Sequence, residues 1–231
     1  MSIAENISGI RRRIETAAKH AARNPVEIAL MAVCKTKPAD AIREAYAAGQ
    51  RLFGENRVQE FATKAPLLSG LSDARFHMIG HLQSNKSKAA AELFSAVDSV
   101  DSLKLAERLN AAARDLGKTL DILIEINVGG EEAKSGMPPE SPEVLQILEH
   151  AKEWQNLRMR GLMTVPPFTE DPEGARPYFR TVRELRDSMA LKGFALDQLS
   201  MGMSHDFEIA IEEGSTCVRV GTAIFGERPT P

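Results

Sequence analysis

Short apolar segments alternate with helical patterns along nearly the whole chain, and this alternation restricts the possible folds more than any other feature. When strands and helices alternate, the strands run parallel and the helices cover the sheet. Eight such segments within about 200 residues predict eight parallel strands closed into a (β/α)8 barrel. The predicted strands are residues 26–35, 51–56, 75–82, 95–100, 120–128, 157–165, 195–202 and 216–226.

An open, doubly wound sheet is the alternative that the same alternation leaves. The barrel is favoured because no GxGxxG motif follows the first predicted strand and because the number of units is eight. Two of the segments, IALMAV (28–33) and LDILIEINV (120–128), are nearly continuous in apolar residues. Such runs are typical of strands that are buried on both faces.

A helix is predicted ahead of the barrel, over residues 1–24. Ser2 and Glu5 make a capping-box pattern at its start. Isoleucines then recur at helical spacing, at Ile3, Ile7, Ile10 and Ile14. This amphipathic pattern predicts a helix packed on the protein body rather than a targeting or membrane segment. We therefore expect one domain over residues 1–231, with the barrel spanning 26–226.

Composition excludes several classes of partner. The 231 residues are 43% hydrophobic and 26% charged, with a formal net charge of -3, so nothing favours binding to nucleic acid or to an anionic membrane. Cys34 and Cys217 lie far apart in apolar runs, which favours reduced, buried thiols over a disulfide. The two cysteines do not stand at the paired spacing of a metal site. We expect a cytoplasmic monomer without a bound metal.

The barrel prediction also locates the functional site. Active sites of this fold lie at the carboxyl ends of the strands, and the loops after strands seven and eight often bind phosphate. These positions hold SMGMSHD (200–206) and VGTAIFG (220–226). Their small residues let backbone N–H groups approach an anion, although such residues also occur in ordinary turns. We predict a phosphate site between these two loops.

Lys35, in the segment MAVCKTKP (31–38), ends the first predicted strand. It is either a solvated cation or, if burial lowers its pKa, an amine that forms a Schiff base with a carbonyl. Strand parity turns both Lys35 and Arg219 inward on neighbouring strands, so we expect them side by side, which favours the neutral amine. A ligand with an aldehyde and a phosphate satisfies this arrangement. Pyridoxal 5'-phosphate and the sugar phosphate of an aldolase both remain open.

Six motifs in this sequence resemble those of the pyridoxal phosphate homeostasis protein family, in the same order and across nearly the whole chain. They are AVCKTKP (32–38), FGENRVQE (53–60), HMIGHLQSNK (77–86), GLMTVPP (161–167), LSMGMSHDFEIAI (199–211) and VRVGTAIFGER (218–228). The resemblance implies a fold type III barrel similar to the N-terminal domain of alanine racemase. It also implies a protein that binds pyridoxal phosphate, supplies it to apoenzymes that depend on it and takes part in vitamin B6 homeostasis.

The resemblance further implies which residues hold the cofactor. Lys35 is expected to form the internal aldimine, Asn56 to lie beside the ring, and Arg219 to lie near the pyridine nitrogen or the phosphate. Residues of the two strand-end loops are expected at the phosphate. The full set is Lys35, Asn56, Ser200, Arg219, Gly221 and Thr222.

Two enzyme classes are the alternatives to a carrier. A racemase of this fold type needs a second base, a tyrosine from a separate domain in alanine racemase, whereas Tyr46 and Tyr178 lie within predicted helices and the chain ends at Pro231. A Schiff-base lyase needs an acidic or tyrosine partner near the lysine, for which Glu55 and Glu125 are weak candidates. We therefore expect no catalytic residues and a carrier role.

Three other polar residues of these motifs are given structural roles. His77 and His81 straddle the end of the third predicted strand and are expected to be packed or hydrogen-bonded. Lys37 lies just ahead of a predicted helix, where lysines are usually solvated. A position of His81 beside the cofactor ring is the alternative that stays open.

Overall fold

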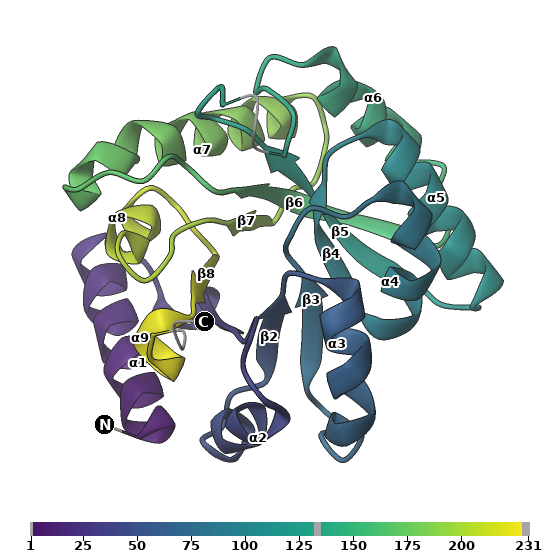
Figure 1. Ribbon diagram of the computed structural model, residues 1–231. Helices are drawn as coiled ribbons and strands as arrows, with labels where there is room; N and C mark the ends of the chain where they lie inside the picture. The colour runs from purple at the N-terminus through teal and green to yellow at the C-terminus, as the bar shows by residue number, and fades with distance from the viewer. Residues whose placement is uncertain (1, 132–134, 228–231) are drawn as a thin grey trace.

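The computed structural model describes residues 2–131 and 135–227. Eight parallel strands form a closed barrel in sequence order, and β8 pairs back with β1 (Figure 1). The predicted barrel is confirmed, and the open sheet is excluded. The expectation of one domain over residues 1–231 includes segments outside the described residues and stays a prediction.

All eight predicted strands are present, but most are shorter than predicted. The last one differs most, because the run predicted as strand 216–226 ends as a strand at Val220 and continues as a short helix. Continuous apolar runs do not by themselves separate a strand from a buried helix. The strands are β1 (Ala29–Val33), β2 (Leu52–Glu55), β3 (Arg75–Met78), β4 (Ala96–Val100), β5 (Leu120–Ile126), β6 (Leu157–Thr164), β7 (Gln198–Ser200) and β8 (Cys217–Val220).

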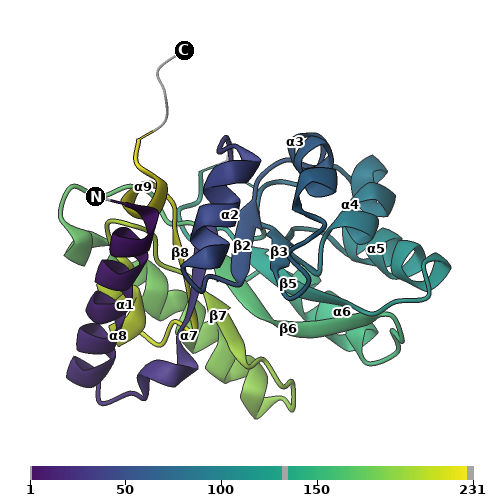
Figure 2. The same cartoon turned by 90° about the horizontal axis from the view of Figure 1, so that it is seen from below.

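Helices cover the outside of the barrel, and the first of them lies alongside α8, α9 and α2 (Figures 1 and 2). Its predicted capping box is confirmed, since Ser2 and Glu5 exchange hydrogen bonds at its start. The α-helices are α1 (Ile3–His20), α2 (Ala39–Ala47), α3 (Val58–Lys64), α4 (Ser87–Leu93), α5 (Leu103–Asp115), α6 (Pro142–Ala151), α7 (Arg176–Leu191), α8 (Phe207–Glu212) and α9 (Thr222–Phe225).

The barrel interior is filled by a small apolar group with polar cavities at both ends. Met31 packs there with Leu52 and Cys217. Gly54 makes room for this packing, because a Cβ at that position would lie only 2.8 Å from the Met31 sulfur. A cavity of about 490 Å³ at the amino-terminal end is lined by residues that begin the strands. A second cavity, of about 560 Å³, opens at the carboxyl end.

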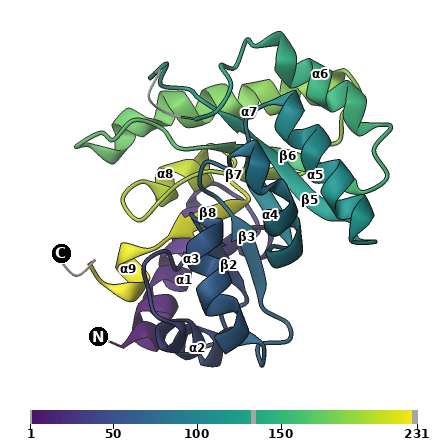
Figure 3. The same ribbon diagram turned by 45° about the vertical axis from the view of Figure 1, so that its right-hand side comes forward.

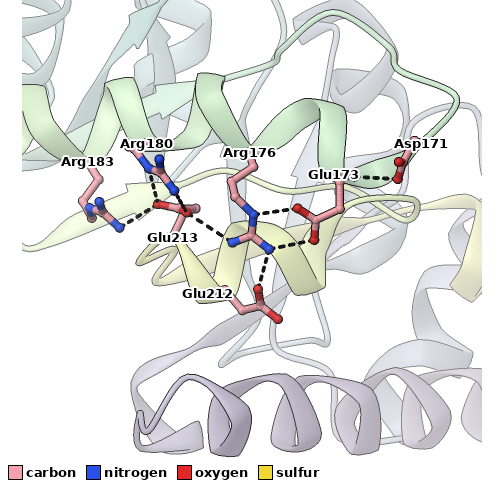
Figure 4. Close-up of polar contacts among 7 residues, drawn as sticks. All are labelled: Asp171, Glu173, Arg176, Arg180, Arg183, Glu212 and Glu213. Carbon is pink, nitrogen blue, oxygen red and sulfur yellow. Dashed lines mark hydrogen bonds and ion pairs between the residues drawn. The ribbon is translucent and has the colours of Figure 1, made fainter.

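An ion-pair network fixes α8 against α7 (Figure 4). Glu213, whose side chain is 5% exposed, accepts hydrogen bonds from Arg176, Arg180 and Arg183. Although burial opposes the shift, these arginines hold the pKa of Glu213 below its usual value. Because α8 directly follows the loop after β7, the network also fixes one of the two loops predicted to bind phosphate.

Candidate functional site

Lys35 lies in a turn at the carboxyl end of β1. The turn is closed by a hydrogen bond from the Lys37 N–H to the Cys34 carbonyl, at 3.1 Å, and Lys35 is half-buried. Thr36 has φ +63°, in the left-handed region that non-glycine residues seldom adopt. Its N–H donates to Oε1 of Glu60 at 2.6 Å. The backbone next to Lys35 is therefore held in an unusual conformation by a side chain of α3.

A buried ion pair supports this turn from the helix side. Lys64 of α3, 9% exposed at its side chain, donates to Oε1 of Glu55 at 2.5 Å and to Oε1 of Glu60 at 2.8 Å. It also lies 3.3 Å from the Cys34 carbonyl oxygen. Burial raises the pKa of Glu55 in spite of this partner. Glu55 is thus paired with Lys64 of α3.

Arg219 lies inside the barrel on β8 and is 4% exposed. Its guanidinium donates to Oγ of Ser200 at 2.8 Å and to the carbonyl of Thr164 at 2.7 Å. In the β1–β8 ladder Arg219 pairs with Met31, four residues before Lys35 in the sequence. The register therefore places Arg219 deeper in the barrel than the turn that carries Lys35, and the side-by-side placement of the two side chains stays a prediction.

The loops that precede α8 and α9 flank β8 (Figures 1 and 3). Gly221 begins the loop after β8, and a Cβ there would lie 3.3 Å from the Val33 carbonyl oxygen. Gly221 therefore lies against the end of β1, and the exposed Thr222 follows it. The structure thus brings this loop beside the turn that carries Lys35.

Ser200 is placed differently from the two loop residues. It ends β7 with 1% exposure, its hydroxyl accepts from Arg219, and it lines the cavity at the amino-terminal end. The half-buried Ser204 lies beyond the strand end, in the loop itself. The assignment of Ser200 to the phosphate stays a prediction.

The cavity at the carboxyl end of the barrel lies over β2, β3, β5 and β6. Asn56 follows β2 directly and lines this cavity, together with His81 and Glu125. The Glu125 carboxylate accepts from the hydroxyl of Ser135 at 3.0 Å. The other lining residues are Ile79, Gly80, Ile126 and Val165.

The remaining motif residues are engaged in hydrogen bonds. His81 Nδ1 lies 3.0 Å from a carboxylate oxygen of Asp101, and His77 Nδ1 lies 3.1 Å from one of Asp98, which confirms their predicted roles. Lys37 donates to the carbonyls of residues 225–227 at 3.0 to 3.1 Å. The prediction of a solvated Lys37 is wrong, because its ammonium caps the end of α9.

Within the described ranges no three His, Cys, Asp or Glu side chains are grouped to hold a metal ion. Both cysteines are buried and free, as predicted. No helix in this part of the chain is long and apolar enough to cross a membrane.

Comparison with known proteins identifies the family. Residues 6–229 match the family model of the alanine racemase N-terminal domain. The pyridoxal phosphate homeostasis protein of Aquifex aeolicus is 45% identical over 229 residues, which cover 99% of each chain. This chain belongs to the pyridoxal phosphate homeostasis protein family. The Pseudomonas aeruginosa member is 46% identical over 227 residues, or 98% of this chain and 96% of that protein.

A solved structure has the same fold as this family member. PipY of Synechococcus elongatus, with pyridoxal phosphate bound, superposes with a TM-score of 0.85 at 37% identity. The superposition covers 97% of this chain and all of PipY. The resemblance predicted from the six sequence motifs is confirmed.

Proposed function

We propose that this protein holds pyridoxal phosphate on Lys35 and supplies it to apoenzymes that depend on it. The proposal rests on one observation: in a member of the pyridoxal phosphate homeostasis family, a half-buried lysine ends β1 in a turn fixed by buried charges, beside the loop of Gly221. Bound pyridoxal phosphate supplies an aldehyde that condenses reversibly with a primary amine. Lys35 provides that amine.

The other polar residues fit the same cofactor. The register of β1 and β8 places Arg219 deeper in the barrel than Lys35, and in this proposal the aromatic ring lies between the two side chains. A permanent cation near the pyridine nitrogen disfavours protonation of that nitrogen, which weakens the ring as an electron sink. We assign Arg219 this role, with Ser200 as the residue that orients its guanidinium. Asn56 then lies beside the ring.

The loop after β8 is assigned to the phosphate. Gly221 and Thr222 begin this loop where it lies against β1, and Ser204 lies in the neighbouring loop. Small residues and hydroxyls allow backbone N–H and side-chain O–H groups to surround an anion. In this proposal, the phosphate is held by both loops and the aldehyde by Lys35.

The placement of the acid-base residues supports a carrier over an enzyme. A general acid or base must lie within hydrogen-bond reach of the proton that it transfers. Tyr46 lies in α2 and Tyr178 lies in α7, so both tyrosines are in helices as predicted. The Tyr46 hydroxyl donates a hydrogen bond to the Asp73 carboxylate. Glu55 is paired with Lys64. We propose a cytoplasmic, monomeric carrier without a catalytic residue.

Borohydride trapping tests the assignment of Lys35. The purified protein is loaded with pyridoxal phosphate, passed through a desalting column and reduced, and the modified peptide is located by mass spectrometry. We expect a phosphopyridoxyl group on Lys35, its loss in Lys35→Ala, and no change in Lys104→Ala, a variant at an exposed position of α5. A label on another lysine would refute the assignment. Amino-acid racemisation that disappears with Lys35→Ala would instead support an enzyme.

A further inference from the structure

Glu125 is a buried carboxylate with an unsatisfied oxygen at the carboxyl end of the barrel. It belongs to β5 and is 7% exposed. Its Oε1 accepts from the Ser135 hydroxyl, whereas Oε2 has no hydrogen-bond partner among the described residues. A buried polar atom of this kind costs free energy unless something binds it. The atom therefore indicates a ligand that donates a hydrogen bond.

The charges around Glu125 indicate a cationic ligand. Burial raises the pKa of Glu125. The hydrogen bond from Ser135 lowers this pKa, and the nearby charge of Asp101 raises it further. Among the described residues, the basic side chains near Glu125 have other partners: Arg219 donates to Ser200 and the Thr164 carbonyl, and His81 lies against Asp101. A ligand with a positive charge and N–H donors would compensate Glu125.

The size and position of the cavity favour a small ligand next to the proposed cofactor. The cavity of about 560 Å³ lies within the range of small-molecule sites. It lies over β2, β3, β5 and β6, whereas Lys35 follows β1 and the phosphate loops follow β7 and β8. A ligand in the cavity therefore approaches from the side away from the phosphate. Asn56, whose amide oxygen can accept a hydrogen bond, lines the same cavity.

We propose that Glu125 and Ser135 bind the ammonium group of a small primary amine, such as a free amino acid. The proposal rests on the function proposed above, because it gives the carrier a site for an amine beside its aldehyde. Other ligands fit less well. A ligand whose only charged group is a carboxylate is repelled by Glu125 and Asp101, whereas an amino acid also carries the ammonium group that Glu125 attracts. No set of three metal-ligand side chains surrounds Glu125 within the described part of the chain.

Calorimetric titration of the cofactor-free protein tests this site directly. Ethylammonium chloride is the probe, and tetramethylammonium chloride, which lacks N–H groups, is the chemical control. We expect the wild type to bind ethylammonium and not tetramethylammonium. Glu125→Gln should weaken binding about tenfold, which corresponds to about 1.4 kcal/mol. Glu27→Gln, which removes an exposed charge at the opposite end of the barrel, should leave binding unchanged.

Equal binding of ethylammonium by wild type and Glu125→Gln would overturn the proposal, as would no binding by the wild type. Ser135→Ala is a second variant, which leaves the Glu125 carboxylate in place. We expect it to bind ethylammonium severalfold more weakly than the wild type. Failure of the proposed function has a different signature. The borohydride label on Lys35 would then be absent while the protein still bound ethylammonium.

Two further probes distinguish the sources of the amine. Glycine represents a free amino acid, and N-acetyl-lysine amide represents a lysine of an apoenzyme. We expect glycine to compete with ethylammonium in the wild type and to lose this effect in Glu125→Gln. If N-acetyl-lysine amide competes and glycine does not, the assignment to free amino acids is overturned, and the site binds a lysine side chain of another protein.

Discussion

Replacing Lys64 by methionine should destabilise the protein and loosen the turn that carries Lys35. Methionine keeps an unbranched apolar chain but removes the ammonium group that contacts Glu55 and Glu60 and lies near the Cys34 carbonyl. Glu55 has a fully buried side chain, and its Oε2 already has no hydrogen-bond partner among the described residues. The substitution leaves this carboxylate without a cation.

The contacts of Lys64 determine how much free energy of unfolding the Lys64→Met variant should lose. Removing one partner of a buried ion pair costs about 3–5 kcal/mol, because the remaining charge stays buried and unpaired. The carbonyl contact of Cys34, at 3.3 Å, is long and adds little. The double variant Lys64→Met/Glu55→Gln removes the unpaired charge and should recover about 1–3 kcal/mol. Since a whole domain is stable by about 5–15 kcal/mol, the loss in the single variant is readily measured.

The pH dependence gives a second signature of the same pair. Burial raises the pKa of Glu55, so the folded state binds a proton more readily than the unfolded state does. Stability therefore falls as the pH rises from the unfolded pKa through the folded one. Without Lys64 this pKa rises further. The deficit of Lys64→Met should be smaller near pH 5 than near pH 8.

Urea unfolding of the full chain, followed by fluorescence and circular dichroism, measures these differences. Lys104→Met on the exposed face of α5 is the control and should stay within about 0.5 kcal/mol of the wild type. Equilibrium dialysis of the loaded proteins should show weaker retention of pyridoxal phosphate in Lys64→Met. A loss below about 1 kcal/mol, or a double variant no more stable than the single one, would refute the argument.

Two further substitutions probe the loop after β7 and its support. Gly202 has φ +94°, and a Cβ there would lie 2.5 Å from the Ala210 Cβ and 2.9 Å from the Phe207 Cα, so Gly202→Ala should cost about 2 kcal/mol or more and weaken cofactor retention. Gly193→Ala is the control, because Gly193 has φ +87° with no described atom within 4 Å of an added Cβ, so the substitution should cost only the backbone strain of about 1 kcal/mol. Equal decreases in melting temperature for Gly193→Ala and Gly202→Ala would exclude crowding as the cause of the loss at Gly202. The lowered pKa of Glu213 contributes stability above its unfolded pKa that is lost as the pH falls through the folded pKa, so the stabilities of Glu213→Gln and the wild type should converge once the pH is below that folded pKa. Parallel stability curves across that range would contradict this.

The sequence was sufficient to predict the barrel because each strand is a local apolar run and the number of runs is itself diagnostic. The residues at which strands end are harder to predict from the sequence. The run at 216–226 is apolar throughout, yet Gly221 turns the backbone and α9 begins at Thr222. Local hydrophobicity is the same on both sides of that turn, so only the contact of Gly221 with Val33 reveals where β8 ends.

Residues placed by strand ends and residues placed by register were predicted with different success. Asn56 and Gly221 directly follow strands, and the structure puts them at the carboxyl end as expected. The relation between Lys35 and Arg219 depends on the stagger of β1 against β8, which parity alone does not define. The partner of Arg219, Ser200, was missed for the same reason.

The partners of buried polar groups are not readable from the sequence alone. In this protein, two buried carboxylates affect two different properties, the stability of the Lys35 turn and the binding of an ammonium group. Glu55 ends β2 and Glu125 is the penultimate residue of β5. Glu55 contacts Lys64 on the helix side, whereas Glu125 lines the cavity at the carboxyl end of the barrel. The first carboxylate supports the backbone of the Lys35 turn, so its loss should affect stability and cofactor retention together. The second has an oxygen unpaired among the described residues, so its replacement should affect ammonium binding while leaving the turn intact. A carrier needs this separation, because the lysine must remain fixed while the opposite wall of the cavity receives and releases a ligand.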